Sequence, residues 1–344
     1  MQSHLVQIKT AAVASLGAAV FLWLNLPLPF LMGPMTFCLI AALLGQDLKG
    51  AGQLGMAFRT ILGVAIGSSI TPEILSELPK MAYSLAILPI FILCVAFTSY
   101  PLMRRVFKFD ATTSYYAAMP GGLQDLLIFG EEAGAYLRAL SLIHATRVLF
   151  IVALAPLLLT AIWQIDLVAP PGKPAAETPI LQIALLIAAG LIGWRVAVRL
   201  KMFGASILGP MILTTILSVT GIITQRPPAE MIWASQFFIG IAVGSRYVGL
   251  TMMEMRTCVF AGVVNSILLA IVSGAFIIAI TRMGLTASGL DAYLAFLPGG
   301  QSEMVVLAII AGADLTYVVL HHILRIALIV TIAPWILRWL KPTP

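Results

Sequence analysis

Long apolar stretches separated by short polar segments run along the whole 344-residue chain. Each stretch is about 17–25 residues long, which suffices for a helix to cross the hydrocarbon core of a bilayer. The pattern predicts an all-α, polytopic membrane protein with about ten transmembrane helices. We expect these helices near residues 10–26, 31–45, 54–70, 82–103 and 135–163, and then near residues 180–194, 204–223, 231–244, 258–281 and 314–338.

The chain is internally duplicated. The segment that starts at Pro120-Gly121-Gly122 recurs 178 positions later at Pro298-Gly299-Gly300, and the two copies share a histidine and an arginine. Two earlier motifs also recur, at shifts of 176 and 177 positions. A common shift indicates that a whole unit of five helices was copied. We therefore predict a first repeat at residues 1–164, a linker rich in proline and alanine at residues 165–179, and a second repeat at residues 180–344.

An odd number of helices per repeat implies that the two repeats have opposite orientations in the membrane. The positive-inside rule agrees with ten crossings, because thirteen of the 20 Lys and Arg residues then fall in inner loops and four in outer loops. This count favours a cytoplasmic location for both termini. The apolar N-terminal stretch, residues 4–30, is interpreted as a retained first helix, because no small-residue cleavage site follows it.

The composition excludes an ordinary soluble domain, since 60% of the residues are hydrophobic and 10% are charged. The formal net charge is +6, but the basic residues are scattered through short loops and do not predict nucleic-acid binding. The three cysteines lie in apolar segments without a CxxC spacing, so we interpret them as buried apolar residues.

The two Pro-Gly-Gly motifs predict interruptions in otherwise apolar segments. Proline lacks an amide donor and glycine disfavours the helix, so a helix should stop there and a new one should restart. Interrupted backbone at membrane depth must be buried in protein or line a cavity, which predicts a re-entrant or broken helix in each repeat. The restarting helix directs free amides and its positive dipole end at the break, and this makes a candidate anion site with four glycines: Gly121, Gly122, Gly299 and Gly300.

An acidic residue follows each break by three positions, Asp125 in the first repeat and Glu303 in the second. Two interpretations stay open. Each acid caps the restarting helix, since acids favour the first turn, or each is a carboxylate that couples transport to a proton or a cation.

His144 and Arg147 lie three residues apart, so they share one face of a helix, and His322 and Arg325 repeat them. An arginine near the middle of a bilayer costs at least ~2.5–3.5 kcal/mol, so it should face a carboxylate or a hydrated cavity. The arginines either form structural pairs with the acids or bind an anionic substrate group, for which a guanidinium is suited. The histidines are either packed residues or take part in proton coupling.

The second copy reads Pro-Gly-Gly-x-x-Glu, then Ala-Gly-Ala-Asp ending at Asp314, then His-His-x-x-Arg with His321 as its first histidine. These motifs resemble the AbrB family of duplicated membrane proteins over essentially the whole chain. The resemblance implies a protein of the bacterial inner membrane, and members carry labels as regulators or as ammonia monooxygenases. The first copy departs from the pattern, with Tyr136 in place of Asp314 and Ile143 in place of His321.

Together these features predict an ion- or proton-coupled secondary transporter of a small, anionic metabolite. The expected partners are the lipid bilayer, the solute, H⁺ or Na⁺, and a second copy of the chain. We count Asp314, His321 and His322 with Asp125, His144 and Glu303 as candidate coupling residues. The alternative is a membrane-embedded sensor that influences gene expression through a partner, although the short loops leave no room for an output domain. An enzyme is not expected, and no cofactor or metal is predicted, because the histidines show no ExxH or HExxH spacing.

Overall fold

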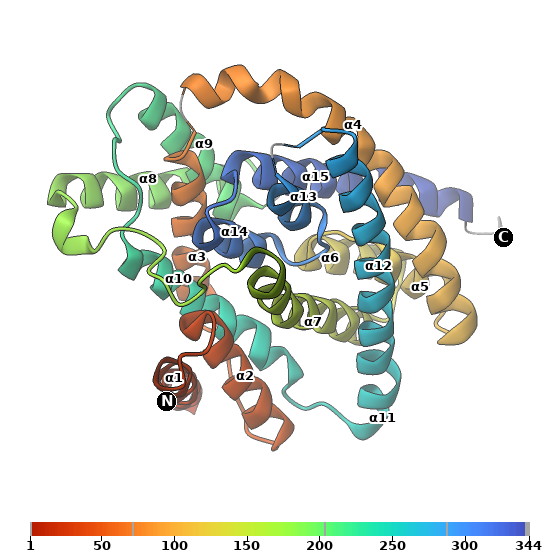
Figure 1. Cartoon of the computed structure of the whole chain (residues 1–344). Helices are drawn as coiled ribbons and strands as arrows, with labels where there is room; N and C mark the ends of the chain where they lie inside the picture. The colour runs from red at the N-terminus through yellow and green to blue at the C-terminus, as the bar shows by residue number, and fades with distance from the viewer. Residues whose placement is uncertain (1, 71, 203, 287, 341–344) are drawn as a thin grey trace. The chain divides into compact units, whose positions relative to one another are not determined.

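The computed structural model describes residues 2–70, 72–202, 204–286 and 288–340. Within these ranges every regular element is helical, as the apolar pattern predicts (Figure 1). A helix is present at each of the ten expected positions. In the first half they are α1 (Gln2–Trp23), α2 (Pro29–Leu43), α3 (Gly52–Gly67), α4 (Pro72–Pro101) and α7 (Leu137–Trp163), and in the second half they are α8 (Ile180–Arg199), α9 (Ala205–Val219), α10 (Ala229–Gly244), α12 (Phe260–Arg282) and α15 (Leu315–Leu340).

The helices divide into two compact units, and each unit draws on both halves of the sequence. The first unit comprises Met1–Leu78, Pro156–Gly249 and Val305–Thr316, and the second comprises Pro79–Ala155, Leu250–Met304 and Tyr317–Pro344. The predicted repeats are therefore segments of sequence that contribute to both units, and neither repeat folds as a separate compact body.

Contacts in the first unit are reciprocal between the two halves. Helix α1 packs on α2 as α8 packs on α9, and α2 packs on α10 as α9 packs on α3. Because each of these pairs is converted into the other by exchanging corresponding helices of the two halves, the packing repeats the duplication seen in the sequence.

Glycines make the close helix contacts of the first unit possible. Gly17 and Gly33 lie against each other's carbonyl groups where α1 meets α2, and Gly193 and Gly209 do the same where α8 meets α9. A Cβ atom at any of the four would collide with main-chain atoms of the other helix. Small residues allow membrane helices to approach closely, so these contacts give the two halves the same local packing.

The helices differ in length in a way that follows the duplication. Among the described residues six spans are long and apolar enough to cross a membrane. They form three repeat pairs, Leu5–Trp23 with Ile180–Arg199, Met81–Val106 with Met252–Arg282, and Leu137–Trp163 with Leu315–Ile332. The four helices α2, α9, α3 and α10 have 15 or 16 residues. At 1.5 Å per residue they reach about 22–24 Å, less than the ~30 Å hydrocarbon core. The structure therefore supports six of the ten predicted crossings by length and apolar composition.

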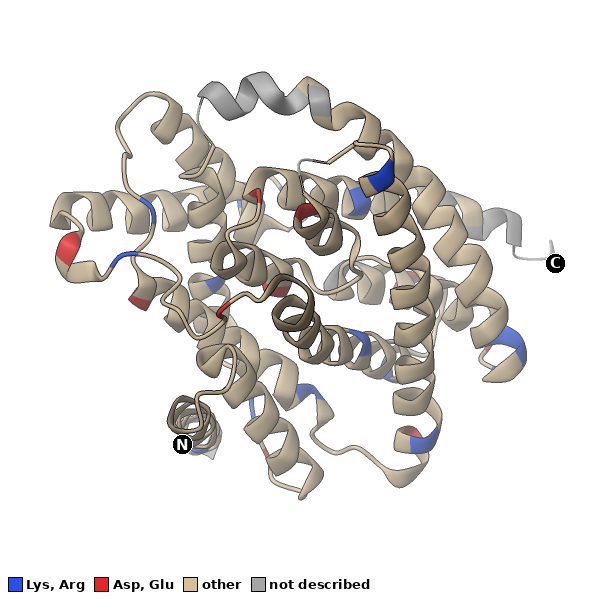
Figure 2. Cartoon of the chain, viewed as in Figure 1, with Lys and Arg blue, Asp and Glu red and all other residues tan. Residues whose placement is uncertain are grey.

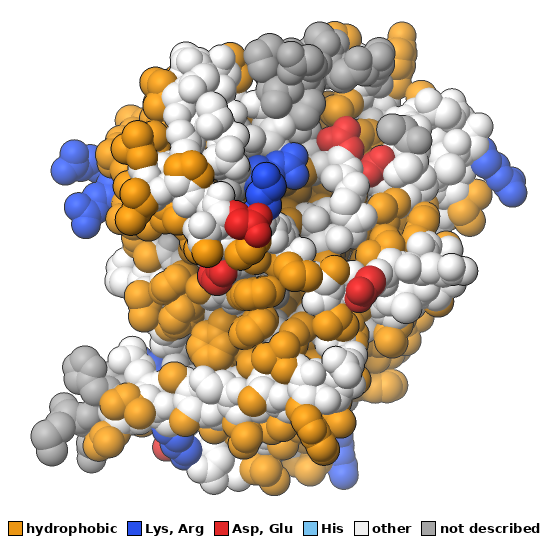
Figure 3. Space-filling view, turned by 60° about the vertical axis from the view of Figure 1, so that its left-hand side comes forward, with side chains coloured by type: hydrophobic (Ala, Val, Ile, Leu, Met, Phe, Trp, Pro, Cys, Tyr) orange, Lys and Arg blue, Asp and Glu red, His pale blue; other side chains and the backbone are white. Residues whose placement is uncertain are grey.

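The outward-facing side chains fit a lipid environment. Many large hydrophobic residues are exposed, including Trp23, Phe97 and Ile180, and hydrophobic side chains cover much of the face in Figure 3. Lys, Arg, Asp and Glu lie mostly at helix ends and in loops, and long stretches of helix carry no charge (Figure 2). A polar solvent would penalise this surface, whereas a bilayer would solvate it.

The glycine contacts generate a stability prediction. We expect Gly33→Ala and Gly209→Ala each to lower the free energy of unfolding by about 1–3 kcal/mol, because the added methyl group overpacks the helix contact. Gly274→Ala is the matched control, since no heavy atom lies within 4 Å of a Cβ at this position in α12. Unfolding measured in detergent or nanodiscs checks this, and equal effects at all three sites would contradict it.

Candidate functional site

Each Pro-Gly-Gly motif separates two short helices, as predicted. In the first half, α5 (Ala111–Ala118) ends at an extended Met119, and α6 (Leu123–Ala133) starts after an extended Gly122. In the second half, α13 (Gly289–Phe296) ends at an extended Leu297, and α14 (Gln301–Ala311) starts after Gly300. Broken helices are therefore confirmed in both halves.

The two histidines of the repeated pairs hold the ends of the helices that precede the breaks. The Nε2–H of His144 in α7 donates to the carbonyl of Tyr116 at 3.1 Å, and the Nε2–H of His322 in α15 donates to the carbonyl of Leu294 at 2.9 Å. Both histidines are fully buried. Tyr116 and Leu294 are 178 positions apart, as are the two histidines, so the same hydrogen bond is formed in both repeats.

The two arginines reach further into the breaks. Arg147 donates from Nη1 to the carbonyl of Met119 at 3.0 Å and from Nη2 to the carbonyl of Gly121 at 2.8 Å. Arg325 donates from Nη1 to the carbonyl of Leu297 at 3.4 Å and from Nη2 to Nδ1 of His322 at 2.6 Å. Met119 and Leu297 are again equivalent positions. In both arginines Nε is buried without a hydrogen-bond partner.

These contacts satisfy groups that a broken helix leaves unpaired. The last carbonyls of a helix have no partner within the helix, and its C-terminus is the negative end of the helix dipole. A guanidinium at that end supplies both donors and positive charge. In the described part of the structure both arginines donate to main-chain carbonyls, and Arg325 also donates to His322. The expected pairing of the arginines with Asp125 or Glu303 stays a prediction.

The charged groups of the two repeats are nevertheless close together in the second unit. Glu303 lies within electrostatic range of Arg147, and Arg147 lies within electrostatic range of Arg325. Both arginines are 2% exposed and Glu303 is 4% exposed. Residues predicted from separate repeats thus contribute to one buried polar region.

Gly300 has a specific steric role at the second break. The carboxylate of Glu303 lies so close to Gly300 that a Cβ atom there would collide with Oε2. A side chain at position 300 would therefore force the carboxylate of Glu303 to move from its place beside the first turn of α14. Asp125, at the equivalent place in α6, has a side chain outside the described part of the structure. Asp314 directly precedes α15 and belongs to the first unit, whereas the other candidate residues belong to the second.

Two further polar side chains lie near this region, and sequence analysis did not identify the role of Ser84. Ser84 in α4 lies 3.1 Å from Nε2 of His321, and neither residue is exposed to solvent. Asn265 in α12 donates to the carbonyl of Ala117 at 3.5 Å, which is a further link to the end of α5. Both contacts join residues more than 140 positions apart, so no local motif could reveal them.

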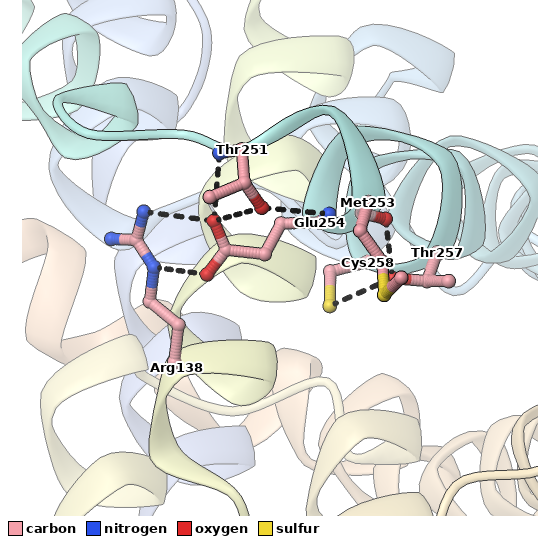
Figure 4. Close-up of polar contacts among 6 residues, drawn as sticks. All are labelled: Arg138, Thr251, Met253, Glu254, Thr257 and Cys258. Atoms are coloured by element: carbon pink, nitrogen blue, oxygen red, sulfur yellow. Dashed lines mark hydrogen bonds and ion pairs between the residues drawn. The ribbon is translucent and has the colours of Figure 1, made fainter.

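A separate ion pair joins α7 to the start of the α12 region (Figure 4). Arg138 contacts Glu254 through Nε at 2.8 Å and through Nη2 at 3.4 Å. Glu254 also accepts from the Thr251 amide at 2.9 Å and hydroxyl at 3.0 Å, in a capping box that starts the short helix α11 (Met252–Glu254). The ion pair therefore fixes a helix start to the neighbouring helix.

The described residues contain no group of three or more His, Cys, Asp or Glu residues placed to hold a metal ion. The polar region combines two guanidinium groups, neutral imidazoles and a carboxylate. This chemistry suits the binding of a small anion and the exchange of protons.

We expect Arg147→Lys to lower the free energy of unfolding by about 1–3 kcal/mol, because an ammonium group cannot reach both carbonyls and one is left unsatisfied. Arg104→Lys is the control, since Arg104 donates to the carbonyl of Phe109 at an exposed site. It should change stability by no more than about 0.5 kcal/mol. Similar losses in the two variants would contradict the capping role of Arg147.

Glu254→Gln tests the ion pair, because glutamine keeps the capping box and removes the charge. We expect the free energy of unfolding to fall by about 1 kcal/mol, as the pair is partly exposed. Thr257→Ala provides the comparison, since Thr257 donates only to the carbonyl of Met253 in its own helix and contacts Cys258. A larger effect at Thr257 would show that the ion pair does not anchor this helix start.

Comparison with known proteins places these features in a family. Two curated relatives are each 27% identical to the chain: "Uncharacterized protein YhjN" of Bacillus subtilis (strain 168), for which the alignment covers 85% of this chain and 80% of the relative, and "Putative regulator AbrB" of Escherichia coli (strain K12), for which it covers 93% and 92%. No solved structure matches. The family model described as "Transition state regulatory protein AbrB" matches residues 5–341, and the chain therefore belongs to the AbrB family.

Proposed function

We propose that this protein is a secondary transporter of a small anionic metabolite, coupled to H⁺ or Na⁺. The observation that carries the proposal is the duplicated set of contacts at the two helix breaks. In both repeats a buried His-x-x-Arg pair holds the carbonyl end of a broken helix. Broken helices with ion-binding ends, contributed by two repeats, are typical of secondary transporters.

The proposal includes an inverted arrangement of the two repeats. Five helices per repeat would reverse the direction of the chain in the membrane, and the exchange of partners between α2, α3, α9 and α10 supports a two-fold relation. In this arrangement α2, α3, α9 and α10 cross only part of the hydrocarbon core or thin the bilayer locally, because they are short.

The electrostatics favour an anionic solute. Two buried guanidinium groups give the polar region positive charge, and the starts of α6 and α14 direct main-chain amides at the breaks. Each arginine retains an unpaired Nε. A carboxylate or a similar oxyanion would supply acceptors for these donors, and Glu303 would balance part of the charge or exchange a cation.

A regulatory function is the second candidate, because one relative is named "Putative regulator AbrB". The name applies to that protein. A regulatory function of this chain would be supported by recovery of a stoichiometric protein partner from membranes, together with an absence of solute flux. The absence of a long cytoplasmic segment argues against an output domain within residues 1–344.

Transport assays test the proposal directly. We expect purified protein in liposomes to take up at least one member of a panel of mono-, di- and tricarboxylates under a pH or sodium gradient. Arg325→Ala should reduce this flux at least tenfold, since it removes a buried donor of the site. Arg199→Gln, at the exposed end of α8, should leave it unchanged. Unimpaired flux in Arg325→Ala would remove the anion role of this arginine.

A further inference from the structure

The hydrogen bonds around the two adjacent buried histidines of α15, His321 and His322, distinguish their protonation states. His322 accepts a hydrogen bond at Nδ1 from Arg325, which has only donors, and so its single proton must lie on Nε2. That proton faces the carbonyl of Leu294. A second proton on Nδ1 of His322 would point at the Nη2–H group of Arg325, so that two donors would face each other. His322 is therefore fixed as the neutral Nε2–H form.

His321 is held differently. Its Nδ1 lies 2.7 Å from the carbonyl of Tyr317, so Nδ1 carries a proton. Its Nε2 lies 3.1 Å from the hydroxyl of Ser84, which can donate or accept. The same hydroxyl lies 2.9 Å from the carbonyl of Met81, one turn earlier in α4. Ser84 has one proton for two acceptors, so the network has two arrangements.

Both arrangements keep a hydrogen bond between Ser84 and His321. With neutral His321, the Ser84 hydroxyl donates to Nε2. When a proton binds to Nε2, the new N–H donates to the Ser84 oxygen, and the hydroxyl rotates and donates to the carbonyl of Met81. The hydroxyl proton stays on Ser84 in both states, and the net change is one proton gained by His321.

The duplication supplies a comparison within the molecule. The positions equivalent to Ser84 and His321, at the shift of 178, are Gly262 in α12 and Ile143 in α7. These two residues are also in contact, since a Cβ on Gly262 would lie 3.1 Å from the carbonyl of Ile143. In this repeat the positions equivalent to Ser84 and His321 carry no polar side chain, and Gly262 packs on Thr146 and on the main chain of Ile143. Packing does not require the Ser–His pair in the other.

We infer that His321 is the proton-carrying residue of the coupling mechanism and that Ser84 is the positioning residue that lets it hold either protonation state. The inference rests on the proposed transport function, and it identifies H⁺ as the coupled ion. Other groups near the His321 ring are the Tyr317 ring, Phe296, neighbouring His322 and the like charge of Arg325. Because Ser84 and His321 are fully buried, exchange of this proton with water requires a local opening of the structure around them.

Nitrogen-15 NMR of histidine-labelled protein in nanodiscs tests the inference without a substrate. We expect His321 to be the neutral Nδ1–H form at high pH and to gain a second proton as the pH falls, while His322 stays Nε2–H throughout. His321→Gln assigns the signal. Ser84→Ala should lower the midpoint of His321 by about 1 pH unit, because the protonated form loses a charge-assisted hydrogen bond, which is stronger than the neutral hydrogen bond that the neutral form loses.

Three outcomes would overturn the inference: a neutral Nε2–H form at His321, no second proton on His321 at any pH at which the protein stays folded, or the same midpoint in Ser84→Ala and wild type. The double variant Ser84→Gly with His321→Ile controls for folding, because it copies the residues of the other repeat. It should remain folded. Failure of the transport proposal is distinguishable, since it would appear as absent solute flux with the NMR behaviour of wild type retained.

Discussion

Unpaired main-chain carbonyls at the ends of α5 and α13 impose the constraint on which the second unit depends. Neither water nor lipid can satisfy these groups inside a membrane protein, so side chains must. Histidine and arginine one turn apart on a neighbouring long helix supply the donors in both repeats. The expensive burial of two guanidinium groups is then a consequence of breaking the helices.

The same duplication has a different result in each unit. In the first unit it gives apolar contacts built around glycines, such as Gly33 against Gly17, and the two halves are nearly equivalent there. In the second unit it brings the polar residues of both repeats together, so that Arg147 of one half lies within electrostatic range of Arg325 of the other. Duplication thus gives nearly equivalent apolar packing in the first unit and a polar region that differs between the repeats in the second.

The sequence predicted the features that depend on local patterns. Apolar stretches predicted the positions of the ten helices. Proline and glycine predicted the positions of both breaks, because these residues interrupt a helix locally. The histidines and arginines were also identified correctly as buried residues. Their main-chain partners were not predicted, since these contacts depend on how α7 packs on α5. Pairs such as Ser84 and His321, 237 positions apart, depend on tertiary structure alone.

Differences between the repeats are more informative about mechanism than their similarities. What both copies keep, the histidine and the arginine, is explained by the need to hold a broken helix. What only the second copy has, His321 with its serine partner, has no such structural explanation, because Ile143 and Gly262 make the equivalent contact without it. A duplicated protein therefore contains its own control. Where one copy shows that packing is satisfied without a polar pair, the pair in the other copy is best assigned to function.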